Sequence, residues 1–373
     1  TIPRSCSRGL IRRLQAIRGS LACWKITNLK APVMTILRSA LVACIAVCAI
    51  NVHSAETAPA QQEREPIVRK DIPAGIKTET MEVQVVSEDE FPDEAKNLPT
   101  LIDKVRTEML ASENPYVLLP HRPNYFLPLT WQARPSNDEL ERAVNQYADK
   151  NVPLEEGYDH LEAIVQLSLK YIIAEDVLGN FSRIELGYTN RSFWQVYNSD
   201  ISRPFRETNH EPELMVSWML KDKIVDYVRL SLNHQSNGQT STLSRSWNRI
   251  IAETAFIVGS GVISPKVWWR IPEGKEADPA DPKDNDNPDI DDYLGYGELN
   301  YVKLMQKHQF SIMVRNNLDF SENRGAVELG YSFPLTKKIK GYAQYFNGYG
   351  ESLIDYDRYQ ERFGIGIKLT DWF

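Results

Sequence analysis

Of the six histidines in the chain, only His234 has neighbours that could support catalysis. It stands two residues before Ser236, in a segment with the alternation of a β-strand. In a strand this spacing directs both side chains to one face, with the backbones roughly 6.5–7 Å apart. A serine hydroxyl is a weak nucleophile near neutral pH unless a base accepts its proton. The pair therefore predicts acyl transfer, although an isolated His-x-Ser could also be a polar hairpin tip.

A third residue is expected from the turn that follows. Asn237 and Gly238 begin a turn, and the returning strand starts within 243–249. If the hairpin is centred near Ser241, Asn248 lies opposite His234 and can hold its second ring nitrogen. Asparagine can fix the orientation of a histidine, but being neutral it stabilises an imidazolium less than aspartate does. The residues thus predict a triad of Ser236, His234 and Asn248. Because Asn248 is neutral, we expect another charged group to assist this triad.

The alternation also indicates which way the triad faces. The face that carries His234 and Ser236 continues backwards through apolar residues such as Leu232 and Leu230, whereas Asn233 points the other way. A nucleophile on an apolar wall suggests a substrate that is delivered from the membrane itself. We therefore expect the catalytic pair to face lipid.

Several other kinds of site are excluded. The chain has no phosphate-binding G-x-x-x-x-G-K-[ST], no H-E-x-x-H and no G-x-S-x-G. All four cysteines precede residue 49, so later residues form no disulfide or thiolate site. The net charge is −7, and residues 1–38 contain eight of the 43 basic side chains, which leaves 35 bases against 50 acids. This acidic balance argues against a nucleic-acid partner.

The N-terminal part has the pattern of an exported protein. Residues 34–55 combine a basic start, a short apolar run and small residues, as a secretory signal peptide does. We therefore expect 1–33 to be an upstream non-native extension and 56–113 to be a polar periplasmic arm with a helix at 98–110. Residues 114–373 would form the folded domain, with a further short helix at 137–150.

Within that domain, period-two alternation predicts an all-β fold with twelve strands of about ten residues. The predicted strands are 125–131, 164–171, 181–188, 213–220, 225–234, 247–257, 262–271, 293–304, 310–318, 326–333, 339–345 and 362–373.

This number and length of strands are typical of a twelve-stranded antiparallel transmembrane β-barrel of the bacterial outer membrane. The mean hydropathy of −0.41, without a long apolar run, excludes membrane-spanning helices. Aromatic residues near strand ends, among them Phe193, Trp218, Trp247 and Trp268, resemble the girdles of such barrels. A soluble exported β-sandwich also alternates and is the alternative on pattern alone.

Four segments together resemble the outer membrane phospholipase A family. Asn233-His234-Gln235-Ser236-Asn237-Gly238 with Ser244-Arg245-Ser246-Trp247-Asn248-Arg249 is the most specific match, and the resemblance covers about 114–373. The others, in the same order as in the family, are Pro204-Phe205-Arg206-Glu207-Thr208-Asn209, Asp286-Asn287-Pro288-Asp289-Ile290 and Gly348-Tyr349-Gly350-Glu351-Ser352-Leu353-Ile354-Asp355-Tyr356.

The resemblance implies a calcium-dependent barrel that hydrolyses acyl esters of phospholipids and lysophospholipids and is active as a homodimer. Ser236 would be the nucleophile, His234 the base and Asn248 its orienting partner, while the Gly238 N–H would stabilise the oxyanion. The implied calcium ligands are the Ser244 hydroxyl, the Gln239 carbonyl, Asp286 and, across the dimer, the Ser202 carbonyl. A non-catalytic barrel that acts as a pore or structural wall protein is the alternative.

Overall fold

The computed structural model of the chain describes residues 99–112, 114, 116–138, 140–141, 157–220, 226–274, 285–336 and 338–371. The predicted upstream extension, the predicted signal peptide and most of the predicted arm lie outside these residues, as does most of the predicted helix at 137–150. Within the described part, no helix combines the length and apolar character needed to cross a membrane.

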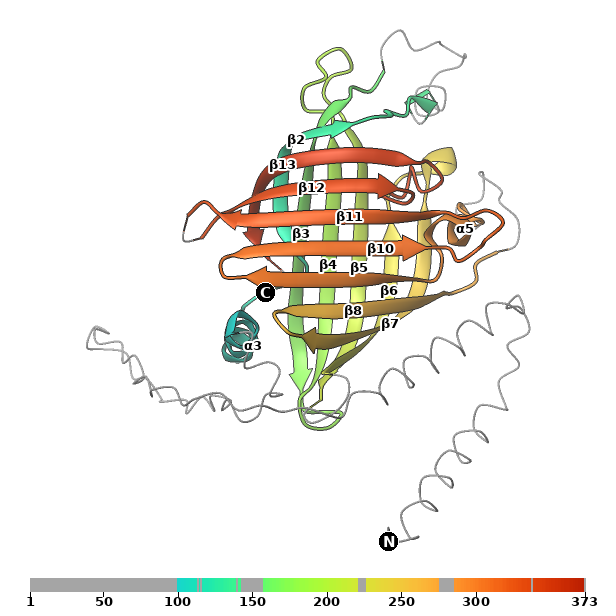
Figure 1. Cartoon of the computed structure of the whole chain (residues 1–373). Helices are drawn as coiled ribbons and strands as arrows, with labels where there is room; N and C mark the ends of the chain where they lie inside the picture. Colours follow the sequence, from blue (N-terminus) through green and yellow to red (C-terminus); the bar gives the residue numbers. More distant parts are fainter. Residues whose placement is uncertain are drawn as a thin grey trace. The chain divides into compact units, whose positions relative to one another are not determined.

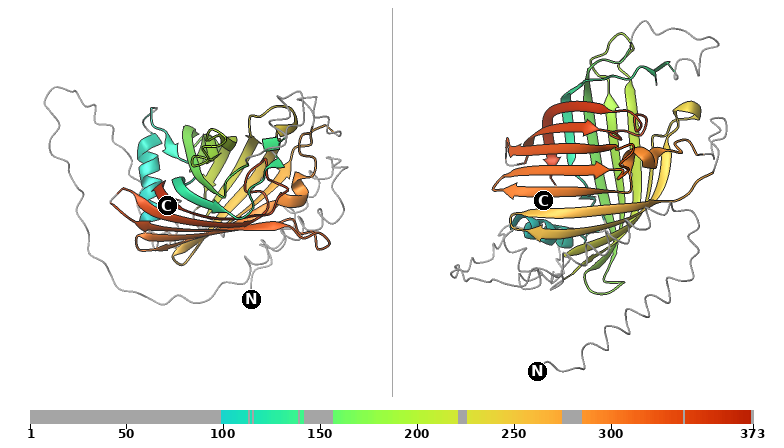
Figure 2. Two further views of the ribbon diagram at one scale, coloured as in Figure 1. Left: turned by 90° about the horizontal axis from the view of Figure 1, so that it is seen from above. Right: turned by 45° about the vertical axis from the view of Figure 1, so that its right-hand side comes forward.

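In the described residues the predicted twelve-stranded antiparallel barrel is confirmed (Figure 1). Each strand from β2 to β13 pairs with its neighbours along the chain, and β13 pairs with β2 to close the sheet. The two-residue strand β1 also pairs with β3, next to the segment of β3 that pairs with β2. Strands β10 to β13 cross in front of β3 to β5 at a steep angle (Figures 1 and 2).

The bounds of the elements are α3 Pro99–Ser112, β1 Leu119–Pro120, β2 Asn124–Gln132, β3 Leu161–Glu175, β4 Ser182–Trp194, β5 Phe205–Met219, β6 Tyr227–Ser236, η4 Ser241–Leu243, β7 Ser246–Val258, β8 Gly261–Arg270, α5 Ile290–Leu294, β9 Gly297–Met305, β10 His308–Asn316, β11 Gly325–Pro334, β12 Lys340–Gly348 and β13 Gln360–Thr370.

The last strand shows how alternation builds the wall. Phe363, Ile365 and Leu369 of β13 are about half exposed on the outer face, whereas Lys368 between them is buried. Apolar side chains outward and polar or small ones inward suit a barrel whose outer surface is lipid. Lys368 forms an ion pair of 2.8 Å with Asp371, so the acid that interrupts the apolar pattern of the sequence serves an inward-facing cation.

Charged side chains fill part of the barrel interior. Arg206 and Arg362 both pair with Glu162, and all three side chains are buried. Arg206 also pairs with Asp355, while Arg362 Nε lies 2.6 Å from Glu351 Oε2. Each of these five buried charges therefore has a partner of opposite sign, which is the condition under which charges are tolerated away from water.

Several predicted bounds need correction, and β4 continues to Trp194 instead of ending at residue 188. Strand β5 begins at Phe205 and not at residue 213, because its first half alternates acids with polar residues, among them the buried Glu207 and Glu211, and shows no apolar stripe. Residues 293–296 do not belong to the strand that was predicted at 293–304. Tyr293 and Leu294 end helix α5, whose Ile290 and Leu294 are buried.

The predicted aromatic girdle is wrong at three residues. Trp247 and Trp268 point inward and pack in a buried cluster with Ile290 and Leu294 of α5. Phe193 is likewise fully buried. Their strand positions have inward parity, so alternation directs the rings to the interior. Other aromatic side chains do stand outward, such as Trp269, which is 44% exposed.

The two ends of the barrel differ in their connections. Short turns join β7 to β8 and β9 to β10 at one end, whereas long connections follow β2, β6 and β8 at the other. Helix α3 packs at the short-turn end, where Glu108 lies 2.9 Å from Lys170 and Ile102 contacts Ile257. The turn of the hairpin that carries His234 and Asn248 therefore lies at the long-loop end.

Candidate active site

The β6–β7 hairpin brings two of the predicted triad residues together. In its register His234 pairs directly with Asn248, and His234 Nδ1 lies 2.9 Å from Asn248 Oδ1. Because an amide oxygen accepts only, this contact requires a proton on Nδ1. The other ring nitrogen, Nε2, is then unprotonated in the neutral imidazole and can act as a base.

Ser236 lies two residues beyond His234, at the end of β6, opposite Ser246 of β7. The described hydrogen bonds include none between Ser236 and His234. Catalytic contacts of this kind are often long before substrate binds. The parity of the strand places both side chains on the same face.

This face is the apolar outer wall of the barrel. Leu230 and Leu232 of β6 are 46% and 54% exposed, and Ile250 of β7 is 46% exposed. The residues of opposite parity, Ser231 and Asn233, are buried at 4% and 1% exposure. The structure thus directs His234 and Asn248 outward with the apolar side chains, as the sequence pattern predicts.

A carboxylate that the sequence pattern did not indicate contacts Asn248 of the predicted triad. Asn248 Nδ2 donates to Glu273 Oε1 at 2.9 Å, so Asn248 is held on both sides. Glu273 lies in the connection after β8, where partial burial raises its pKa although the positive charge of Arg270 opposes the shift. Nothing in the sequence signals this contact, because Glu273 belongs to a loop and stands 25 positions after Asn248.

The turn after Ser236 is held by one side chain. Asn237 Oδ1 accepts from the N–H groups of Gln239, at 3.2 Å, and Arg245, at 3.0 Å, while its Nδ2 donates to the Leu243 carbonyl at 2.9 Å. Gly238 adopts a left-handed φ of +65°, which a glycine adopts without strain. No described hydrogen bond uses the Gly238 N–H, so it is free to donate to a substrate.

The predicted calcium ligands gather in part. Ser244 Oγ donates to Asp286 Oδ2 at 2.6 Å, and Asp286 Oδ1 accepts from the Ser246 N–H at 3.0 Å. Ser244 and Asp286 offer hydroxyl and carboxylate oxygens, the donor types that calcium prefers, so they fit this ion. Ser202 lies in the β4–β5 connection with a left-handed φ of +66° and has no described hydrogen bond to Ser244 or Asp286. No group of three His, Cys, Asp or Glu side chains suited to a metal occurs among the described residues.

A second histidine, His210, lies beside the turn and was also missed. It pairs with Ser236 in the β5–β6 register, and its ring approaches Gly238. Its Nδ1 contacts the Tyr188 hydroxyl at 2.7 Å. The alternation of inward and outward side chains along β5 could have indicated His210. The acidic residues of that strand obscure this alternation in the sequence.

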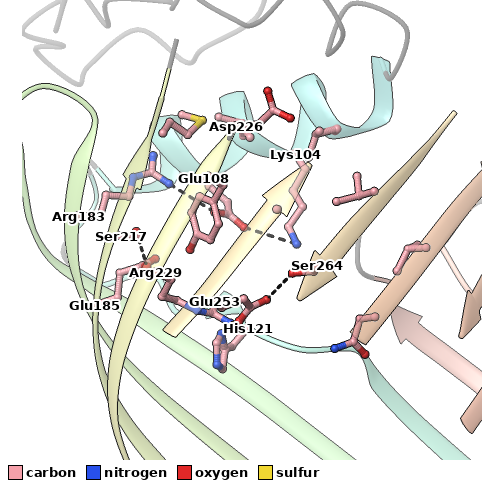
Figure 3. Close-up of a pocket in the computed structure, with 18 of the residues that line it drawn as sticks. Lys104, Glu108, His121, Arg183, Glu185, Ser217, Asp226, Arg229, Glu253 and Ser264 are labelled. Carbon is pink, nitrogen blue, oxygen red and sulfur yellow. Dashed lines mark hydrogen bonds and ion pairs between the residues drawn. The ribbon is translucent and has the colours of Figure 1, made fainter. Parts of the chain in front are cut away.

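A cavity of about 240 Å³ lies at the other end of the barrel, beside α3 (Figure 3). Its lining is strongly charged, but the charges pair with one another. Lys170 lies 2.9 Å from Glu108 and 3.0 Å from Glu185, and Ser264 donates to Glu253 at 2.9 Å. None of the triad residues lines this cavity, so it is separate from the site on the outer wall.

The chain is similar in sequence and in structure to proteins of one family. The phospholipase A1 family model matches residues 101–369. The phospholipase A1 of Klebsiella pneumoniae is 34% identical over 270 residues, which cover 70% of this chain and 85% of the relative. The outer membrane phospholipase A of Escherichia coli has a TM-score of 0.60 at 32% identity, covering 70% of this chain and 95% of that one. The outer membrane phospholipase of Salmonella typhi, a dimer with bound calcium, has the same TM-score and identity and is covered to 94%.

Proposed function

The chain belongs to the phospholipase A1 family of outer membrane phospholipases, and from this premise we propose how it performs its reaction. It is an ester hydrolase of the bacterial outer membrane. We propose that it cleaves acyl esters of phospholipids at either position, and those of lysophospholipids, with Ser236 as nucleophile, His234 as base and Asn248 as orienting residue. The observation that carries the proposal is the 2.9 Å contact of His234 Nδ1 with Asn248 Oδ1 on the outer wall.

The proton path follows from that contact. Ser236 Oγ attacks the ester carbonyl carbon while His234 Nε2 takes the hydroxyl proton. The tetrahedral intermediate then collapses, and the imidazolium returns this proton to the departing alkoxide, which leaves as the lysophospholipid. A water molecule next attacks the acyl-serine with His234 again as base, and it releases the fatty acid and restores Ser236.

Charge develops on the carbonyl oxygen during both attacks. The free N–H of Gly238 can donate to this oxygen, and such donors usually provide the largest catalytic contribution. Ser244, Asp286 and the Gln239 carbonyl would hold calcium, with the Ser202 carbonyl coming from a partner subunit. When bound, calcium would supply positive charge that stabilises the developing oxyanion.

Access to substrate supports this reaction. The triad stands on the apolar wall near the long-loop end, which in outer-membrane barrels faces outside. A phospholipid in the outer leaflet could therefore present its ester without leaving the bilayer. The paired charges of the barrel interior, such as Glu162 with Arg206, favour a filled barrel over a pore.

The decisive experiment is release of fatty acid from mixed phospholipid–detergent micelles, with calcium and then with excess chelator. We expect calcium-dependent release by the refolded protein and a loss of at least about 10⁴-fold in Ser236→Ala. The partly exposed Ser236 contributes little packing, so the variant should keep the folded barrel. Unchanged hydrolysis by Ser236→Ala would refute the assignment, and ion conduction without hydrolysis would favour the pore.

A further inference from the structure

We propose that Glu273 is a positioning residue of this active site and extends the proposed triad to Ser236, His234, Asn248 and Glu273. Glu273 Oε1 accepts a hydrogen bond of 2.9 Å from Asn248 Nδ2, on the side of the amide opposite to His234. The inference rests on the proposed function and adds to it a residue that acts through Asn248.

The first consequence concerns the orientation of the Asn248 amide. An asparagine can turn its side chain by half a rotation and exchange oxygen for nitrogen with little change of shape. With the nitrogen toward His234, the amide would donate to Nδ1, and the proton would move to Nε2. His234 could then no longer accept the serine proton.

A carboxylate removes this ambiguity because it only accepts hydrogen bonds when ionised. Glu273 therefore keeps the Asn248 nitrogen on its own side and the oxygen toward His234. The proton of the neutral ring consequently stays on Nδ1, and Nε2 remains the base.

The second consequence concerns charge. Asn248 itself is neutral, but Glu273 contacts it and carries a negative charge. This charge can stabilise the imidazolium of His234 that forms during attack. Arg270 Nη2 lies 3.7 Å from Glu273 Oε2, and this ion pair helps to hold the Glu273 side chain in place. The other charged groups that act on Glu273 are Asp286 and His234 itself.

The chain offers a matched control. Arg270 also lies 3.9 Å from Asp291 of α5, which makes no described contact with the triad. Asp291→Asn therefore removes a carboxylate from the same arginine and leaves Asn248 untouched. Glu273→Gln keeps the shape of the side chain but offers both an acceptor and a donor to Asn248.

We would measure fatty acid release from mixed micelles as a function of pH for both variants. In Glu273→Gln we expect kcat to fall about 10-fold, the size usual for a residue that orients a functional ligand, with KM unchanged. Asp291→Asn should change neither quantity, and Glu273→Asp should recover part of kcat.

Nitrogen-15 NMR spectra of the histidine rings give a readout that does not depend on activity. The signals of His234 are identified as those that are missing from the spectrum of His234→Gln. We expect the neutral ring to carry its proton on Nδ1 in the wild type and to become a mixture of both forms in Glu273→Gln. Unchanged kcat and an unchanged proton position would overturn the inference, as would equal losses in Glu273→Gln and Asp291→Asn. Activity that persists in Ser236→Ala would instead overturn the proposed function.

Discussion

A neutral asparagine contacts His234 in this protein, at the position where many serine hydrolases use an aspartate. Being neutral, Asn248 can orient His234 but offers no negative charge to an imidazolium, so that charge would have to come from another residue. Glu273, which contacts Asn248, could supply this negative charge, whereas Ser244 and Asp286 are groups that could bind a calcium ion.

Asn248→Ala should therefore leave measurable activity. We expect kcat to fall about 10–100-fold, because the base and the Gly238 N–H remain while the orientation of His234 is lost. Fatty acid release by this variant, compared with Ser236→Ala under the same conditions, tests the expectation. A loss as complete as that of Ser236→Ala would mean that Asn248 does more than orient.

Asp291 should make stability depend on pH. Burial raises its pKa from 3.8 to about 6, although Arg270 opposes the shift. The folded state thus binds this proton more tightly than the unfolded chain, so stability falls as the pH rises from 3.8 through about 6 and stays lower above it.

Asp291→Asn should accordingly stabilise the barrel above pH 6 by up to about 3 kcal/mol and have little effect near pH 4. Thermal unfolding in detergent micelles at both pH values measures the difference. A gain of equal size at pH 4 and pH 8 would show that ionisation of Asp291 is not its cause.

At the scale of elements, the strands present one apolar and one polar face. Ile365, at the middle of β13, is 46% exposed and pairs with Leu129 of β2, which is 49% exposed. Such a row is stable only if lipid covers it.

Ile365→Arg should destabilise the barrel by about 2–4 kcal/mol, the cost of an arginine near the bilayer midplane. The matched control is Phe320→Arg, in the β10–β11 loop, where the side chain is 93% exposed and already faces water. Chemical unfolding in lipid vesicles would compare the two. Similar small effects in both variants would contradict a lipid-facing β13.

At the scale of the whole molecule, the predicted calcium ligands lie in separate connections of the chain. Ser244 and Asp286 contact each other, whereas Ser202 lies in the β4–β5 connection without a described contact to either. A second copy of the chain could supply the missing ligand, and calcium binding would then favour the dimer by mass action.

We predict that calcium shifts the protein in detergent micelles from monomer to dimer. Asp286→Asn should raise the calcium concentration required by about 10-fold, whereas Asp291→Asn should leave it unchanged. Sedimentation with calcium and with chelator provides the measurement. Dimers of equal abundance with calcium and with chelator would contradict the prediction, because dimer formation would then not depend on calcium.

Local patterns in the sequence were enough to predict the barrel, the outward face of β6 and the pairing of His234 with Asn248. Alternation and a short turn act over a few residues, so they determine which side chains share a face and which stand opposite. The full length of β5 was not predictable in this way, because charges that pair inside the barrel interrupt its apolar pattern.

Only the tertiary structure decided three further features. It placed Glu273 against Asn248, joined Ser244 to Asp286 across 42 positions, and buried Trp247 and Trp268 against α5. Each depends on where a long connection packs after the sheet has closed, and such packing joins residues distant in the chain, which periodicity does not encode.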